Sequence, residues 1–211
     1  MRASTFTPLL RQPFSKPSYA FQQTRYFGIP SISSFTPSLP APAPRTVTAT
    51  RTLPLPPLPL FRTISSVEAY GEFLPFLTAS TVTARDRVTG YPSRAYLTVG
   101  YGPLSETFLS KVECDEKNWT VCARSGERAF KDEQGNKEGD GGIFEYLDTM
   151  WKLTPLEGRA IGMERTRVDL SVNFKFRSAV HAAMMSAVEG QVAGMMIEAF
   201  EKRVKAVQGV R

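Results

Sequence analysis

Few residues in this chain could carry out acid–base, nucleophilic or metal chemistry. His181 is the only imidazole among 211 residues, and Cys114 and Cys122 are the only thiols. A structural zinc site would need nearly all of these side chains together. The sequence also has no glycine-rich phosphate loop and no nucleophile-elbow pattern. We therefore predict a protein that is not an enzyme and has no metal or catalytic cofactor. His181 is interpreted as a surface or packing residue, and both cysteines as reduced thiols in a sheet.

The chain is better supplied with side chains that suit an apolar ligand. Met184, Met185, Met195 and Met196 fall within one short segment near the C-terminus. Unbranched thioether side chains repack around irregular contents. Each methylene group removed from water contributes roughly 0.8 kcal/mol, so a long hydrocarbon ligand can bind tightly without specific polar contacts. Plain core packing is the alternative interpretation of these methionines.

Positive charge is concentrated at the N-terminus. The net charge is +6, but residues 1–45 hold five basic and no acidic residues, which leaves 21 basic against 20 acidic residues in 46–211. Without a dense run of Lys and Arg in 46–211, we expect no nucleic-acid partner. Residues 1–45 also contain eight prolines and eleven Ser or Thr. An acid-free, Arg-containing and Ser-rich segment is typical of an organelle transit peptide, so we predict that 1–45 is a disordered mitochondrial transit peptide. A simple disordered basic arm is the alternative.

The remaining residues, 46–211, predict strands followed by one long terminal helix. Segments with turn signals between them form the predicted strands: 46–53, 79–87, 94–99, 104–114, 119–124, 143–153 and 167–176. The last of these alternates apolar and polar residues throughout, as a half-buried strand does. Two short helices are expected between the first two strands. From 178 to 208 no proline occurs, and apolar residues recur at every fourth position: Met184, Val188, Val192, Met196, Phe200 and Val204.

This order of elements predicts an α+β helix-grip fold. Consecutive strands are usually neighbours, so a curved antiparallel sheet of six or seven strands should wrap the C-terminal helix. The helix must bury its apolar stripe against the sheet. We expect a hydrophobic cavity between them.

Four separated segments resemble the mitochondrial coenzyme Q-binding proteins of the START and polyketide cyclase-like superfamily. Residues 69–80 (AYGEFLPFLTAS) are similar to the motif that follows the first helices of that family. Residues 97–106 (LTVGYGPLSE) are similar to its central strand pair, and 168–178 to its last strand and the entry to its terminal helix. Residues 199–203 (AFEKR) match the way that helix ends.

The resemblance implies that 46–211 is a START-like lipid-binding domain with ubiquinone as its bound ligand. It further implies a lipid chaperone or carrier needed for respiratory electron transport and efficient ubiquinone biosynthesis. Such a protein would lie peripherally on the matrix side of the mitochondrial inner membrane. Its expected partners are ubiquinone, the lipid surface of that membrane, and respiratory or quinone-biosynthesis complexes. No catalytic residue carries over from the family.

Placed on this fold, thirteen apolar residues are the candidates for the quinone-binding wall. The candidates from the sheet and loops are Phe73, Phe76, Val99, Tyr101, Leu104, Trp151, Val172 and Phe174. The candidates from the helix are Met184, Met185, Val188, Met195 and Met196. The aromatic cluster at 70–76 has a second interpretation as a lid that meets the bilayer, because aromatic rings favour the lipid–water interface.

Two other functions stay open at this point. Other members of the superfamily suggest a cyclase-like enzyme, which would need polar side chains converging inside the cavity. The fold also occurs in bacterial ribosome-associating relatives, which suggests a protein-interaction module.

Overall fold

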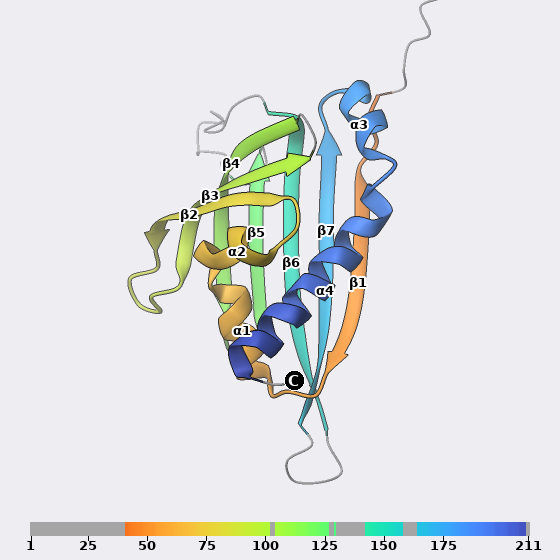
Figure 1. Cartoon of the computed structure of the whole chain (residues 1–211). Coiled ribbons are helices and arrows are strands. Elements are labelled where there is room, and N and C mark those ends of the chain that lie inside the picture. The colour runs from red at the N-terminus through yellow and green to blue at the C-terminus, as the bar shows by residue number, and fades with distance from the viewer. Residues whose placement is uncertain (1–40, 102–103, 127–128, 130–141, 158–163, 210–211) are drawn as a thin grey trace, which may run out of the picture. The chain divides into compact units, whose positions relative to one another are not determined.

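The computed structural model describes residues 41–101, 104–126, 129, 142–157 and 164–209. Nearly all of the predicted transit peptide, 1–45, lies outside these residues. In the described part, a seven-stranded antiparallel sheet is covered on one face by helices (Figure 1). No helix in these residues is both long enough and apolar enough to cross a membrane.

The sheet contains the predicted strands, with boundaries shifted by a few residues at most. Its members are β1 (Arg45–Leu53), β2 (Leu77–Arg85), β3 (Pro92–Tyr101), β4 (Leu104–Asp115), β5 (Thr120–Gly126), β6 (Phe144–Leu156) and β7 (Arg165–Phe176). Their spatial order is β1-β7-β6-β5-β4-β3-β2. Strands β2 to β7 are each beside the next in sequence, and β1 pairs with the last strand, with Val47 opposite Val172. The expectation of six or seven antiparallel strands is confirmed as seven.

The segment between β1 and β2 forms the expected short helices. They are α1 (Pro57–Ser65), the 3₁₀ turn η1 (Val67–Ala69) and α2 (Tyr70–Phe73). Proline is tolerated in the first helical turn, where its missing N–H has no intrahelical acceptor. Leu60, Phe61 and Ile64 are at most 1% exposed, so α1 is anchored by one apolar face.

The terminal helix is broken, and the prediction of one continuous helix over 178–208 is wrong. The structure has α3 (Ala179–Met185) and α4 (Glu189–Gln208), separated by a turn at 186–188. The Ser186 hydroxyl donates to the Ala183 carbonyl at 2.7 Å, and the Ser186 N–H donates to the same oxygen. A serine side chain that competes for backbone acceptors weakens a helix. Helix α4 then starts afresh with Glu189 in its first turn, where a negative charge favours the helix dipole.

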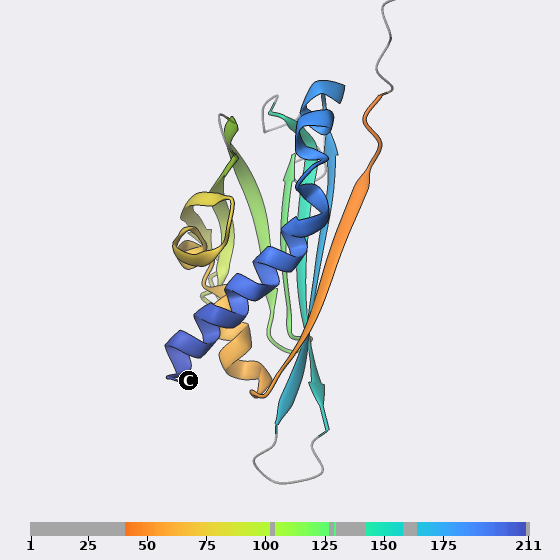
Figure 2. The same cartoon turned by 45° about the vertical axis from the view of Figure 1, so that its right-hand side comes forward.

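The core lies between α4 and the covered face of the sheet. Helix α4 buries Ala193, Ile197, Phe200 and Val204, and the Phe200 ring lies 5.2 Å from that of Trp151 on β6. Strand β7 buries every second residue, as its alternation predicts. Figure 2 shows α4 running diagonally across the sheet, with α1 and α2 on the same side.

Ion pairs hold the C-terminal half of α4 in place. Glu201 pairs with Arg51 of β1 at 3.3 Å, and Arg203 pairs with Glu72 of α2 at 2.8 Å. These pairs are partly exposed, so each contributes little to stability. They join this part of the helix to the edge strand β1 and to α2.

Candidate ligand cavity

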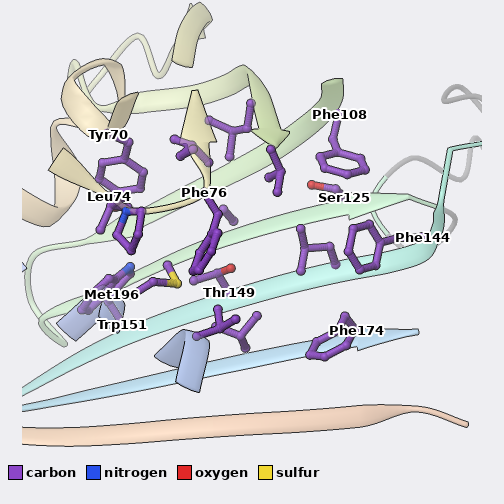
Figure 3. A pocket seen from close by; sticks show the side chains of 18 of the residues that line it. Tyr70, Leu74, Phe76, Phe108, Ser125, Phe144, Thr149, Trp151, Phe174 and Met196 are labelled. Carbon is purple, nitrogen blue, oxygen red and sulfur yellow. The ribbon is translucent and has the colours of Figure 1, made fainter. Parts of the chain in front are cut away.

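A cavity of about 130 Å³ lies between α4, the segment from η1 to β2, and the sheet (Figure 3). A single water needs roughly 10–15 Å³ of such space. The cavity therefore has room for an organic group. Strands β2 to β7 all contribute to its wall, and Met185, Val192 and Met196 approach from the helical side. The cavity expected between helix and sheet is present.

The polar side chains of the wall mostly have partners within the protein. The Tyr70 hydroxyl donates to the Ile64 carbonyl, and burial raises the pKa of this phenol far above its usual range. The Ser125 and Ser110 hydroxyls pair at 2.7 Å. Glu189 forms an ion pair with Arg45 at the start of β1. Because these groups are already satisfied, the interior suits a ligand that is mainly hydrocarbon.

Aromatic rings crowd one end of the cavity. The Phe144 ring lies 5.5 Å from Phe108, 6.0 Å from Phe174 and 4.6 Å from Phe176, between ring centroids. Figure 3 shows Phe108, Phe144 and Phe174 at this end, and Trp151, Met196 and Tyr70 at the other. The cavity is thus elongated along the sheet.

Phe76 enters the cavity from a left-handed backbone conformation. Its φ is +68°, which is rare for a bulky residue because Cβ approaches the carbonyl oxygen. The Phe76 carbonyl accepts the Gly100 N–H at 2.7 Å, which ties this turn to β3. Unfavourable backbone geometry of this kind tends to occur at functional sites. Here the turn directs the Phe76 ring into the centre of the cavity (Figure 3).

The structure brings seven of the thirteen predicted wall residues together. Those that line the cavity are Phe76, Val99, Trp151, Val172, Phe174, Met185 and Met196. The side chains of Tyr101 and Leu104 lie outside the described residues. The structure does not bring the remaining four, Phe73, Met184, Val188 and Met195, to the cavity.

Two of the misplaced helix residues, Met184 and Val188, belong to the series of apolar residues at every fourth position, and Met195 lies beside that series. Residues four apart on an α-helix drift by about 40° per step, so a series of six cannot stay on one face. The break at 186–188 resets the helix as well. Met184 is 47% exposed and Met195 is 42% exposed, and Val188 lies in the turn.

Phe73 was predicted to line the cavity wall but packs against other residues instead. Its ring contacts Tyr70 edge-on at 5.9 Å, and the Arg203 guanidinium lies 5.6 Å from its centroid. It therefore helps to join α2 to α4. Tyr70 and Leu74 are buried, which turns this part of the aromatic cluster at 70–76 inward.

Several wall residues were missed, although strand alternation could have found some of them. Leu97 lies two residues before Val99, and Phe176 lies two after Phe174, so each shares a face with a predicted residue. Phe108 lies opposite Leu97, and Phe144 lies opposite Phe176. These last two depend on the register between strands.

A separate polar pocket lies near the start of α3. It is lined by Ser105, Glu106, Thr107, Gly142, Ile143, Arg177, Ser178 and His181. Glu106 accepts the Ile143 N–H at 2.6 Å. Burial raises the pKa of Glu106, while this hydrogen bond and the charges of His181 and Arg177 oppose the rise. These polar groups are outside the apolar cavity.

The two cysteines are free thiols on neighbouring strands of the sheet. Burial is the main reason that the pKa of Cys114 rises to about 12. Burial also raises the pKa of Cys122. Nucleophilic thiolates are therefore disfavoured at both positions. Among the described residues, no group of His, Cys, Asp and Glu could hold a metal ion.

Comparison with known proteins places this architecture in a family. The family of polyketide cyclases, dehydrases and lipid-transport proteins matches residues 53–201. The mitochondrial coenzyme Q-binding protein coq10 of Schizosaccharomyces pombe is 39% identical over 146 residues, covering 69% of this chain and 78% of that protein. The corresponding protein of Eremothecium gossypii is 30% identical over 69% of this chain and 65% of its own length.

Two more distant matches extend the comparison. The ribosome association toxin RatA of Pseudomonas aeruginosa is 28% identical over 71% of this chain and 88% of its own length. A START superfamily structure from Mycobacterium smegmatis superposes with a TM-score of 0.59 at 18% identity, over 77% of this chain and 98% of that one. With the first two relatives and the family match, these findings show that the chain belongs to the coenzyme Q-binding protein family, within the START-like polyketide cyclase and lipid-transport superfamily.

Proposed function

We propose that this chain binds ubiquinone in the cavity beneath α4 and acts as a lipid chaperone or carrier. The apolar cavity between helix and sheet carries this proposal. Its wall offers hydrocarbon, aromatic and thioether surface, which suits a quinone with a polyprenyl tail. The relatives from Schizosaccharomyces pombe and Eremothecium gossypii are named as coenzyme Q-binding proteins. The protein is proposed to hold its ligand without chemically changing it.

Lipid extraction from the purified protein tests this proposal. The full chain is expressed in a ubiquinone-producing host, and the extracted lipids are identified by mass spectrometry. We expect ubiquinone at a substantial fraction of the protein concentration. A protein that is folded but free of quinone, and that fails to bind added quinone, would contradict the proposal.

A matched pair of variants adds a control within the sheet. Leu97 lines the cavity on β3, whereas Leu109 on β4 lies opposite Tyr96, a residue that is 48% exposed. Leu97→Gln places an amide in the apolar wall and should lower the bound quinone several-fold, because burying an unpaired amide is unfavourable. Leu109→Gln makes the same change on the outer face and should leave the quinone content unchanged.

We also propose a place for this activity in the cell. The relatives are named mitochondrial, and the composition of 1–45 suits a mitochondrial transit peptide. We propose peripheral attachment to the matrix side of the inner membrane, where the protein supports respiratory electron transport and ubiquinone biosynthesis. Fusion of 1–45 to a fluorescent protein tests import. Carbonate extraction and protease protection of isolated mitochondria test attachment and side.

The two alternative functions, a cyclase-like enzyme and a ribosome-associating module, require different features of the structure. A cyclase needs polar groups converging inside the cavity, and the partnered Tyr70, Ser125 and Glu189 offer little for that chemistry. The similarity to RatA favours a ribosome-associating module as the second candidate. Co-sedimentation with mitochondrial ribosomes that persists after quinone depletion would support that second candidate.

A further inference from the structure

The indole of Trp151 is an unsatisfied donor in the cavity wall. Trp151 is 2% exposed, and its Nε1 is buried without a hydrogen-bond partner in the described structure. A buried indole N–H usually finds an acceptor, and an exception calls for an explanation. Trp151 also lines the cavity, at the end opposite the Phe144 cluster (Figure 3).

Among the described residues, none accepts a hydrogen bond from this indole. Across the sheet, the residues opposite Trp151 are Val121 on β5 and Leu170 on β7, and both are apolar. Phe200 packs on the Trp151 ring at 5.2 Å. Figure 3 shows the Met196 side chain beside the ring, on the side of the cavity.

Water is a poor substitute as the missing partner. A buried water needs two to four polar neighbours to be stable. The Tyr70 hydroxyl nearby donates to the Ile64 carbonyl, and Glu189 is engaged by Arg45. A molecule that brings its own acceptor together with an apolar body satisfies this site better than water does.

We propose that the Trp151 Nε1–H donates a hydrogen bond to a carbonyl oxygen of the bound quinone head group. This inference rests on the proposed function and adds an orientation and a basis for selectivity. An indole nitrogen donates only, and a quinone carbonyl accepts only, so the two are complementary. Met196 yields its place beside the indole, because a thioether side chain repacks readily.

The hydrogen bond sets the direction of the ligand. With the head group beside Trp151, the tail runs along the cavity toward Phe108, Phe144 and Phe174 (Figure 3). A polyprenyl hydrocarbon without a carbonyl would fill the same volume but leave the indole unpaired. Trp151 therefore selects quinones over the apolar lipids that share their tails.

Substitution of each tryptophan in the full chain tests the donor. Trp151→Phe keeps an aromatic ring against Phe200 and removes the N–H. Trp119→Phe is the matched control, because Trp119 is the only other tryptophan and packs 5.6 Å from Phe61, away from the cavity wall. The two ligands are decylubiquinone, which has the head group and a short tail, and squalene, an isoprenoid hydrocarbon without oxygen.

The expected result is selective for ligand and position. Trp151→Phe should weaken decylubiquinone binding by roughly three- to tenfold, the range for one lost hydrogen bond. Its squalene affinity should stay within about twofold, which also shows that the variant folds. Trp119→Phe should bind both ligands as the unmodified chain does. Equal weakening for both ligands, or no weakening for decylubiquinone, would overturn the inference.

Nuclear magnetic resonance observes the same bond directly. In the Trp119→Phe protein, Trp151 is the sole indole, so its ¹H–¹⁵N signal is unambiguous. We expect decylubiquinone to shift the indole proton downfield, and squalene to leave it without that shift. Saturable decylubiquinone binding with no downfield shift refutes the hydrogen bond while leaving quinone binding intact. Absence of any decylubiquinone binding by the unmodified chain instead refutes the proposed function itself.

Discussion

Ala123→Leu should stabilise the ligand-free protein, although it enlarges a side chain on the inner face of the sheet. Ala123 lies on β5 between Val112 of β4 and Thr149 of β6, and it lines the cavity. Leucine adds three carbon atoms, each contributing about 0.8 kcal/mol when buried, so the gain cannot exceed about 2.4 kcal/mol. Ordering a leucine side chain costs about 0.5–1 kcal/mol. The expected net gain in the free energy of unfolding is about 1–2 kcal/mol.

Ala193→Leu is the control, because it makes the same change where space is absent. Ala193 lies on α4, is 1% exposed, and belongs to the packed core without lining the cavity. Adding carbon atoms to a filled core forces side chains off their rotamers and costs about 1–3 kcal/mol. The two substitutions should thus change stability in opposite directions and differ by about 2–5 kcal/mol.

Urea unfolding of the full chain, followed by circular dichroism, measures this difference from the transition midpoints. The volume filled in Ala123→Leu is the volume proposed for the ligand, so decylubiquinone affinity should fall as stability rises. If Ala123→Leu is destabilised as much as Ala193→Leu, the space beside Ala123 is not available to added atoms. The reasoning from the cavity to a carrier would then fail.

Three further predictions concern a glycine, a carboxyl group and a thiol. Gly194→Ala should raise the free energy of unfolding by about 0.5–1 kcal/mol, because glycine is unfavourable inside a helix and an added Cβ at this position meets no atom within 4 Å. A lower midpoint of thermal unfolding than that of the unmodified chain would contradict this prediction. Because burial raises the pKa of Glu106, the folded state binds its proton more tightly than the unfolded chain, and its charged form is a penalty above the folded pKa. Glu106→Gln should therefore unfold at a higher urea concentration than the unmodified chain at pH 7, and the difference between the two unfolding midpoints should shrink toward pH 4. A lower midpoint for Glu106→Gln at pH 7 would show that the neighbouring charges outweigh burial. Because its pKa is about 12, the Cys114 thiol should react with a disulfide reagent at pH 8 much more slowly in the native protein than in urea. Mass spectrometry of the labelled peptide measures both rates. Equal rates would mean that the fold does not protect this thiol.

Strand positions could be predicted because a half-buried strand has a visible period of two residues. In β7 the buried residues Val168, Leu170 and Val172 alternate with polar ones, and the predicted strand matches the observed one to within two residues. The break between α3 and α4 carries no comparable signal. It contains no proline or glycine, and it depends on the hydrogen bonds of Ser186 to the preceding turn.

On the sheet, the candidate site was predictable where one strand's own periodicity determines which side chains face inward. Val172 and Phe174 follow from the alternation of β7. Phe108 and Phe144 join the wall through cross-strand register, which depends on turns and bulges far along the chain. Phe76 was predicted as a wall residue, but residue type alone argues against the left-handed backbone conformation that places its ring.

Helix α4 both packs in the core and covers the cavity, and this division explains how an unfilled cavity coexists with a stable fold. In its C-terminal half Phe200 and Val204 are fully buried, and the pairs of Glu201 and Arg203 join this half to β1 and α2. The first half presents Val192 and Met196 to the cavity instead. Because the C-terminal half is densely packed and Ala193 and Ile197 anchor the first half, Val192 and Met196 can cover space that is not filled. We therefore expect a ligand to enter and leave by rearranging methionine side chains, without unpacking the contacts that hold the helix on the sheet.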